Sequence, residues 1–109
     1  MDKAFDILAE FWRPMVKAYA NTLTNDPHVA EDITQETFMS AFERLDDFDE
    51  SQCFGKWLRG IARNKVRNYR KRAHLRSPII DPKVLEGIEL VYNAYDSPDS
   101  QRHSRWEDR

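Results

Sequence analysis

Apolar residues recur at intervals of three and four positions through three long stretches of this chain, and stop signals separate the stretches. The first covers residues 3–24, the second runs from Pro27 to about Leu45, and the third from about Gln52 to about His74. This spacing places apolar side chains along one face of an α-helix. The pattern therefore predicts an all-α fold, a compact bundle of three to four helices.

The ends of these helices carry specific signals in the sequence. Asp26 is placed to cap the second helix, and Pro27 suits its first position, where the missing N–H would have no partner inside the helix. Ser51 is a candidate cap for the third helix. Pro14 lies inside the first stretch and predicts either a kink or a helix that begins near Arg13.

Composition excludes several classes of protein. The 109 residues are 40% apolar, enough for one small domain, and a single cysteine cannot form an internal disulfide. The three histidines lie far apart, and there is no nucleophile–base pair or glycine-rich phosphate loop, so we expect no metal, no cofactor and no enzyme activity. Without an export leader or an apolar run long enough to span a membrane, the chain is expected to be cytoplasmic.

The chain divides into two parts by its pattern. Residues 1–76 form the predicted helical domain, and beyond them the periodicity weakens. Apolar residues between Val84 and Tyr92 predict one further short helix, and the residues from Arg105 onward read like the start of another helix. We therefore interpret residues 77–109 as a linker and the start of a missing C-terminal domain.

Charge is strongly segregated along the sequence. Residues 26–52 hold nine acids and one base, whereas residues 53–76 hold nine bases and no acid. A chain that needed charge only for solubility would mix the two signs. The segregation therefore predicts two differently charged working surfaces on one domain.

The third helix has a basic face opposite its apolar face. On a helical wheel the side away from the apolar residues carries Lys56, Arg59, Arg63, Arg67 and Arg70. Like charges one turn apart destabilise a helix by about 0.2–0.5 kcal/mol per pair. A bound polyanion would relieve that repulsion, so the face predicts contact with nucleic-acid phosphates.

A border strip separates these two faces of the third helix. Asn64, Asn68 and Lys71 line this border beside Trp57, where their side chains could contact base edges. Trp57 is either an exposed surface on which a base stacks or a buried core residue. Both alternatives for Trp57 are open on the sequence alone.

The second helix carries apolar residues that its core face does not need. The residues predicted to face the core are Ala30, Ile33, Thr37, Phe38, Ala41 and Leu45. Met39 and Phe42 fall outside that arc, next to Asp32, Gln35 and Glu36. An apolar pair ringed by polar residues is typical of the centre of a protein interface, unless the first helix or the tail covers it.

Two runs of the sequence together resemble region 2 of bacterial RNA polymerase sigma factors of the extracytoplasmic-function (ECF) group. The first is AEDITQETFMSAFERLDDF, from Ala30 to Phe48, and the second is FGKWLRGIARNKVRNYRKR, from Phe54 to Arg72. The order and spacing of the acidic run, the tryptophan-containing run and the basic stretch carry the resemblance. It spans approximately residues 4–75.

The resemblance implies a dissociable polymerase subunit that docks on the clamp helices of the largest subunit of core RNA polymerase and opens promoter DNA at the minus-ten element. The residues that match the docking helix of the family are Asp32, Gln35, Glu36, Met39 and Phe42. Those that match its promoter-reading helix are Asn64, Asn68 and Lys71 for the non-template strand and Arg63 and Arg67 for the DNA backbone. The residues that match the border of a pocket for a flipped base are Asp49, Glu50, Ser51 and Gln52. An anti-sigma factor is a further candidate partner.

Two functions from other classes also fit the residues. A helical protein-interaction adaptor would use the basic helix to bind an acidic partner. A general duplex-DNA-binding module would use the same basic residues without needing Asn64 or Asn68. A preference for single-stranded minus-ten DNA in the presence of polymerase distinguishes a sigma factor from both.

Overall fold

The computed structural model describes residues 3–73 and 81–95, and the regular elements of this part of the chain are all helical. They are α1 (Lys3–Thr24), α2 (Pro27–Glu43), the short 3₁₀ helix η1 (Leu45–Asp47), α3 (Phe54–Arg72) and α4 (Pro82–Tyr95). The predicted all-α fold is confirmed. Contacts divide the chain into two units, Met1–Ile79 and Ile80–Arg109.

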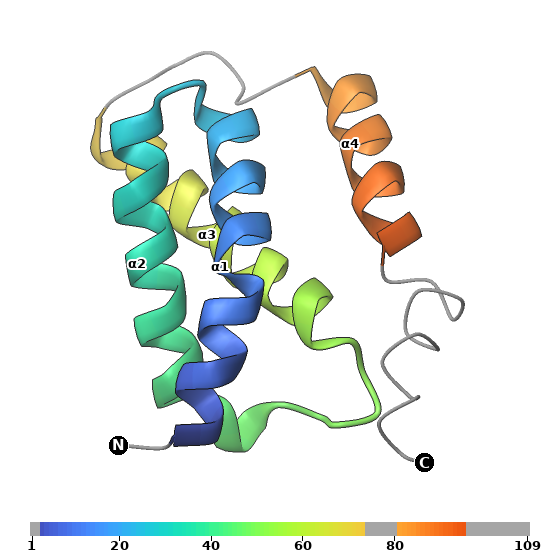
Figure 1. Cartoon of the computed structure of the whole chain (residues 1–109). Coiled ribbons are helices and arrows are strands. Elements are labelled where there is room, and N and C mark those ends of the chain that lie inside the picture. The colour runs from blue at the N-terminus through green and yellow to red at the C-terminus, as the bar shows by residue number, and fades with distance from the viewer. Residues whose placement is uncertain (1–2, 74–80, 96–109) are drawn as a thin grey trace. The chain divides into compact units, whose positions relative to one another are not determined.

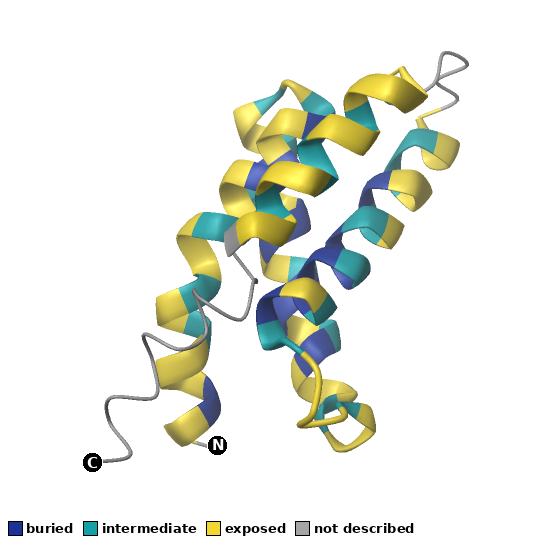
Figure 2. Ribbon diagram, turned by 90° about the vertical axis from the view of Figure 1, so that its right-hand side faces the viewer, coloured by how far each residue is buried: buried dark blue, intermediate teal, exposed yellow. Residues whose placement is uncertain are grey.

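The first unit is a bundle in which α1, α2 and α3 each pack against the other two. α1 and α2 run antiparallel side by side, and α3 crosses them (Figure 1). Figure 2 shows that buried residues lie on the inner sides of these helices. The most deeply buried apolar residues are Val16, Tyr19, Ala20, Ala30, Ala41, Leu58, Ala62 and Val66.

A tight turn joins α1 to α2 with the predicted signals. Asn25 has a φ of 54°, a left-handed conformation that asparagine tolerates at the end of a helix. The Asp26 carboxylate then accepts hydrogen bonds from the backbone N–H groups of His28 and Val29, so the predicted N-cap is confirmed. Pro27 occupies the first position of α2, as the sequence predicts.

Pro14 does not begin a new helix. It lies inside α1, which is assigned as one continuous helix, and its ring is exposed. A proline inside a helix removes one backbone hydrogen bond, and water can satisfy the carbonyl that is left when the site faces solvent. The alternative of a helix start near Arg13 is therefore wrong.

The connection from α2 to α3 corrects a second prediction. Ser51 does not cap α3, which begins at Phe54 with Cys53 in the cap position and no side-chain cap bond. Instead, the backbone N–H and the hydroxyl of Ser51 both donate to Oδ1 of Asp49, at 2.9 and 2.8 Å. The serine completes a turn within the loop, a local arrangement that competes with capping in the sequence pattern.

The core face predicted for α2 is largely correct. Ala30, Ile33, Thr37, Phe38 and Ala41 are buried, and Leu45 is only half-buried because α2 ends before it. The structure adds one residue that the pattern missed, a buried threonine at position 34. The hydroxyls of the two buried threonines donate to the carbonyls one turn earlier at 2.7 Å, which satisfies them inside the core.

The start of α3 lies very close to α1. A Cβ atom at Gly55 would lie 2.6 Å from Cζ3 of Trp12, so only glycine fits against this indole. Phe11 packs edge-on against the same ring, with 5.2 Å between the centroids. This approach fixes the crossing of α3 over α1 and therefore the direction in which the rest of α3 projects.

The second unit contains α4. The short helix predicted between Val84 and Tyr92 is confirmed and is somewhat longer than predicted. Asp81 supports its first turn by accepting a hydrogen bond from the backbone N–H of Lys83 at 2.8 Å.

The predicted helix start at Arg105 lies outside the described residues, and the interpretation of residues 77–109 as a linker and the start of a missing domain stays a prediction. Among the helices described, none has the length and apolar character that a membrane crossing needs.

Candidate nucleic-acid interface and docking face

A polar strip of α3 faces solvent while the opposite side of the helix fills the core. Asn64, Arg67, Asn68 and Lys71 are all exposed. Leu58, Ile61, Ala62 and Val66 are buried on the other side. The border that the helical wheel predicted, Asn64, Asn68 and Lys71, is therefore exposed, and Arg67 of the predicted basic face is exposed beside it. We call these four residues, Asn64, Arg67, Asn68 and Lys71, the reading strip.

Hydrogen bonds hold two of the predicted DNA-contacting arginines. Nη1 of Arg67 donates to Oδ1 of Asn64 at 2.9 Å, which joins two members of the reading strip. Nη1 of Arg63 donates to the hydroxyl of Tyr19 at 3.4 Å. Tyr19 is buried in the core and Arg63 is only half-buried, so the core of the bundle helps to orient this guanidinium at the surface.

Arg59 is buried, although the wheel predicted it on the exposed basic face. Its side chain is 1% exposed, and Nη1 donates to Sδ of Met15 at 3.9 Å. A wheel places residues by angle alone, whereas α1 covers the side of α3 on which Arg59 lies. This arginine packs inside the bundle and cannot contact a phosphate without leaving it.

Trp57 lies in an aromatic cluster with Phe48 and Phe54. The ring centroids are 5.0 Å apart for Phe48 and Trp57, 5.6 Å for Phe54 and Trp57, and 5.2 Å for Phe48 and Phe54. Trp57 is half-buried, which lies between the two alternatives for this residue. Because Phe48 precedes the loop and Phe54 follows it, the cluster ties the two ends of residues 49–53 together.

The loop clamped by this cluster is exposed and acidic. The predicted pocket residues Asp49, Glu50, Ser51 and Gln52 are all exposed. Hydrogen bonds from the backbone N–H and the hydroxyl of Ser51 hold the pKa of Asp49 below its ordinary value of 3.8. The Asp49 carboxylate therefore stays ionised at neutral pH, and it would repel a phosphate group that approached it.

The docking face of α2 is exposed where the sequence predicts it. Asp32, Gln35, Met39 and Phe42 are exposed, and Glu36 is half-buried. Met39 is 61% exposed, whereas Phe42 is 40% exposed because its ring packs edge-on against Phe5 of α1 at 5.2 Å. The first helix therefore covers Phe42 in part and leaves Met39 accessible.

The sequence reasoning missed exposed apolar residues on α1. Ile7 and Phe11 are the most exposed large apolar residues of the described chain, at 68% and 72%, and Leu8 is exposed as well. The contact between Phe5 and Phe42 places the first turns of α1 beside the end of α2. The signal was available, since Ile7 and Phe11 are one turn apart and lie off the face of α1 that carries its buried residues, such as Val16 and Tyr19.

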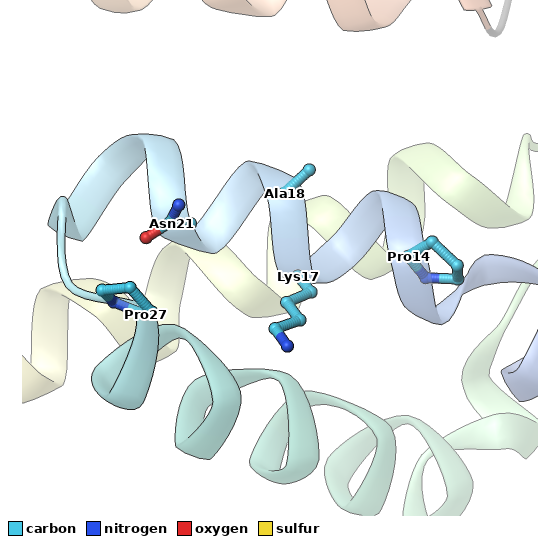
Figure 3. A pocket seen from close by; sticks show the side chains of 5 residues that line it. All are labelled: Pro14, Lys17, Ala18, Asn21 and Pro27. Carbon is cyan, nitrogen blue, oxygen red and sulfur yellow. The ribbon is translucent and has the colours of Figure 1, made fainter.

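A hollow lies between α1 and the start of α2 in the described part of the chain. The hollow in Figure 3 is lined by Pro14, Lys17, Ala18 and Asn21 of α1 and by Pro27 of α2, and Lys17 is the one ionisable residue in this set. Beside it, Glu31 pairs with Lys17 at 3.0 Å and with Arg13 at 3.1 Å. No group of three metal-binding side chains occurs in the described part of the chain.

The surfaces of α2 and α3 both lie within a segment that matches a known family. The model of sigma-70 region 2 matches residues 8–76. The chain belongs to the sigma-70 region 2 family. Both the docking face of α2 and the reading strip of α3 fall inside the matched residues, so the family assignment covers the whole of the candidate site.

Curated relatives agree with this assignment. The ECF RNA polymerase sigma factor SigM of Bacillus subtilis is 32% identical over 96 residues, which cover 88% of this chain and 56% of that protein. The ECF RNA polymerase sigma factor BldN of Streptomyces coelicolor is 32% identical over 95 residues, 86% of this chain and 36% of that protein. The RNA polymerase sigma factor NccH of Alcaligenes xylosoxydans xylosoxydans is 39% identical over 61 residues, 56% of this chain and 33% of that protein.

These relatives confirm the resemblance to ECF sigma factors. SigM and BldN are both named as ECF sigma factors. Similarity to them supports the assignment of this region 2 segment to the ECF group. The chain spans less than two thirds of the length of each relative named above. No solved structure matches the chain.

Proposed function

We propose that this chain is the part of an ECF sigma factor that binds core RNA polymerase through α2 and reads the minus-ten promoter element through α3. It acts in transcription initiation, in the cytoplasm, as a regulatory subunit without catalytic chemistry of its own. Membership of the sigma-70 region 2 family supports this proposal. The observation that carries it is the reading strip, in which Asn64, Arg67, Asn68 and Lys71 are exposed together.

The reading strip suits single-stranded DNA. Lys71 and Arg67 supply positive charge for the backbone, and the amides of Asn64 and Asn68 can form hydrogen bonds with base edges. Arg63 stands at the margin of the strip, where its bond to Tyr19 orients the guanidinium for a phosphate. The strip therefore combines non-specific and specific contacts on one helix, which a purely electrostatic duplex binder does not need.

The loop before α3 is better suited to contact a DNA base than the DNA phosphate backbone. Its carboxylates, Asp49 and Glu50, would repel phosphates, whereas an unstacked base can accept and donate hydrogen bonds there. The half-buried ring of Trp57 lies in the cluster that clamps this loop, so its remaining surface is available for stacking. We propose that residues 49–52 border the site of a flipped base on the non-template strand.

The docking face suits the clamp helices of the largest polymerase subunit. Met39 is an exposed apolar residue among polar neighbours, as at the centre of a protein interface. Asp32 and Glu36 would favour a partner with basic residues around an apolar centre, and they would keep DNA away from α2. An anti-sigma factor that covered this face would compete with polymerase, which makes it the second candidate partner.

A binding experiment with core RNA polymerase tests the proposed function. The chain is mixed with polymerase, and its complex is offered a fork DNA whose minus-ten non-template strand is single-stranded, or a fully paired duplex of the same sequence. We expect tighter binding to the fork, and a dependence of that preference on the minus-ten sequence. Equal binding to both forms would leave the general duplex binder, and polymerase binding without any DNA effect would leave the protein-interaction adaptor.

A further inference from the structure

The bond between Arg67 and Asn64 fixes the orientation of the asparagine amide. The two oxygen and nitrogen positions of an asparagine side chain are hard to distinguish by shape alone. A guanidinium has five N–H donors and no acceptor, so the atom 2.9 Å from Nη1 of Arg67 has to be Oδ1. The Nδ2 amino group of Asn64 is consequently available to a base, whereas one of the two lone pairs of Oδ1 is already engaged by Arg67.

The residue one turn before Asn64 leaves open space beside it. Side chains on an α-helix lean toward its N-terminus, so Asn64 leans over position 60. That position is Gly60, and a Cβ atom built there would meet nothing within 4 Å apart from its chain neighbours and the nearby backbone of α3. The surface next to the Asn64 amide can therefore admit a planar group such as a base.

The charge of Arg67 makes Asn64 a donor to bases. A charge-assisted bond at Oδ1 polarises the amide and strengthens the N–H groups at its other end. Asparagine reads adenine by a paired contact in which Oδ1 accepts from the adenine N6 amino group while Nδ2 donates to N7. Because the guanidinium of Arg67 already donates to Oδ1, the N6 amino group of adenine would be a second donor at the same oxygen, next to a positive charge.

We infer that Asn64 selects thymine through O4 or guanine through O6, keto oxygens that replace the amino groups of cytosine and adenine, and that Arg67 is the positioning residue that imposes this choice. The inference rests on the proposed function, because it assigns the chemistry of one contact within the reading strip. It adds a direction to that contact: the protein donates and the base accepts.

Base selection by the polymerase complex tests the inference. The chain bound to core polymerase selects from a pool of fork DNA in which the single-stranded minus-ten region is randomised. At one position we expect the wild-type protein to favour thymine or guanine over adenine by about tenfold, and Asn64→Ala to lose that preference. Asn64→Asp keeps the bond to Arg67 but offers only acceptors, so the preference at that position should move to adenine or cytosine, which carry a donating amino group (N6 or N4) where guanine and thymine carry the keto oxygens O6 and O4.

Variants of Arg67 separate positioning from stability. Arg67→Ala should admit adenine at the same position, because the amide is then free to turn, while Arg67→Lys should keep the discrimination, because an ammonium group also only donates. Arg13→Ala, which removes an arginine that pairs with Glu31 outside the reading strip, is the control and should leave this position unchanged. Gly60→Leu, which fills the open space, should keep polymerase binding and lose the preference that depends on Asn64.

The outcomes separate failure of the inference from failure of the proposed function. A wild-type protein that selects no sequence at any position of the fork would overturn the proposed function and the inference with it. A wild-type protein that selects, with adenine at the Asn64-dependent position or with no position that depends on Asn64, would overturn the inference alone. Retention of the wild-type preference by Asn64→Asp would also overturn it.

Discussion

Nη1 of Arg59 donates to Sδ of Met15 at 3.9 Å, so one arginine of the basic helix points into the bundle and not toward solvent. The side chain is 1% exposed, whereas Arg67, two turns later, is exposed. The two arginines therefore differ in environment, one buried and one exposed, although they lie on the same side of the helical wheel. Arg59 contributes packing and Arg67 contributes to the reading strip.

Truncation of these two arginines should affect stability very differently. Arg59→Ala leaves a cavity in the core and should lower the free energy of unfolding by about 2–5 kcal/mol. Arg67→Ala removes an exposed side chain and should change it by about 0.5 kcal/mol or less. Urea denaturation followed by circular dichroism measures both. Equal midpoints for the two variants would show that Arg59 is not a core residue.

A methyl group at Gly55 should destabilise the bundle. Gly55→Ala would place its Cβ 2.6 Å from the indole of Trp12, and the displacement of α3 or of the ring should cost about 1–3 kcal/mol. Gly60→Ala is the matched control on the same helix, where nothing lies near the added atom and alanine favours the helix by up to about 1 kcal/mol. Thermal unfolding should therefore shift in opposite directions for the two substitutions.

Loss of Met39 should weaken polymerase binding without loss of the fold. Met39→Ala and Gln35→Ala remove exposed side chains, and each should reduce affinity for core polymerase several-fold, up to about tenfold for an interface centre. Phe42→Ala also removes the contact with Phe5, so it should cost roughly 0.5–1.5 kcal/mol of stability as well.

A pull-down with core polymerase, together with urea denaturation, separates the two effects. Leu90→Ala on α4 is the control, because it truncates an equally exposed apolar residue outside the docking face. If Met39→Ala and Gln35→Ala are recovered with polymerase at the level of the control, the assignment of the docking face to α2 is incorrect.

Removal of two positive charges from α3 should reduce the salt dependence of DNA binding. Each phosphate contact on a single strand contributes a slope of about 0.7 to the dependence of the logarithm of affinity on the logarithm of salt concentration. Arg63→Ala with Arg67→Ala should therefore lower the slope by roughly 1.4. Arg13→Ala is the control, because the guanidinium of Arg13 on α1 pairs with Glu31 on α2, away from the reading strip. A slope that stays at the wild-type value would remove both arginines from the DNA surface.

The ion pairs of Glu31 should make stability depend on pH in a defined direction. Its hydrogen bond with Lys17, and more weakly its bond with Arg13, hold the pKa of Glu31 below the ordinary 4.5. A depressed pKa in the folded state gives stability that is present above 4.5 and is lost as the pH falls through the folded value. Glu31→Gln should therefore lower the urea midpoint at pH 7 and have less effect in strong acid. An equal effect at both pH values would contradict this.

Much of the local structure followed from the sequence. The three-and-four spacing predicted the helices of the bundle, and Asp26 and Pro27 predicted the start of the second helix. These features are determined within a few residues, because helix periodicity and capping depend on near neighbours in the chain. The exposure of Met39 and of the reading strip followed for the same reason.

The assignment of residues at the margins of these faces needed the tertiary structure. Arg59 and Arg63 both belong to the predicted basic face, but Arg59 is buried against Met15 while Arg63 reaches the surface beside Tyr19. Likewise, the position of Ser51 in the sequence predicted a helix cap, but its hydroxyl donates to the Asp49 carboxylate within the loop.

The sequence by itself determined that this chain makes amphipathic helices with one acidic surface and one basic surface. Only the tertiary structure decided which basic side chains remain at the surface and how they are held. The physical reason is that the crossing of α3 over α1, set by the contact between Gly55 and Trp12, depends on residues that are distant in the chain. That crossing determines which side of α3 is covered, and so it separates the arginine that packs in the core from the arginines and asparagines that stay at the surface.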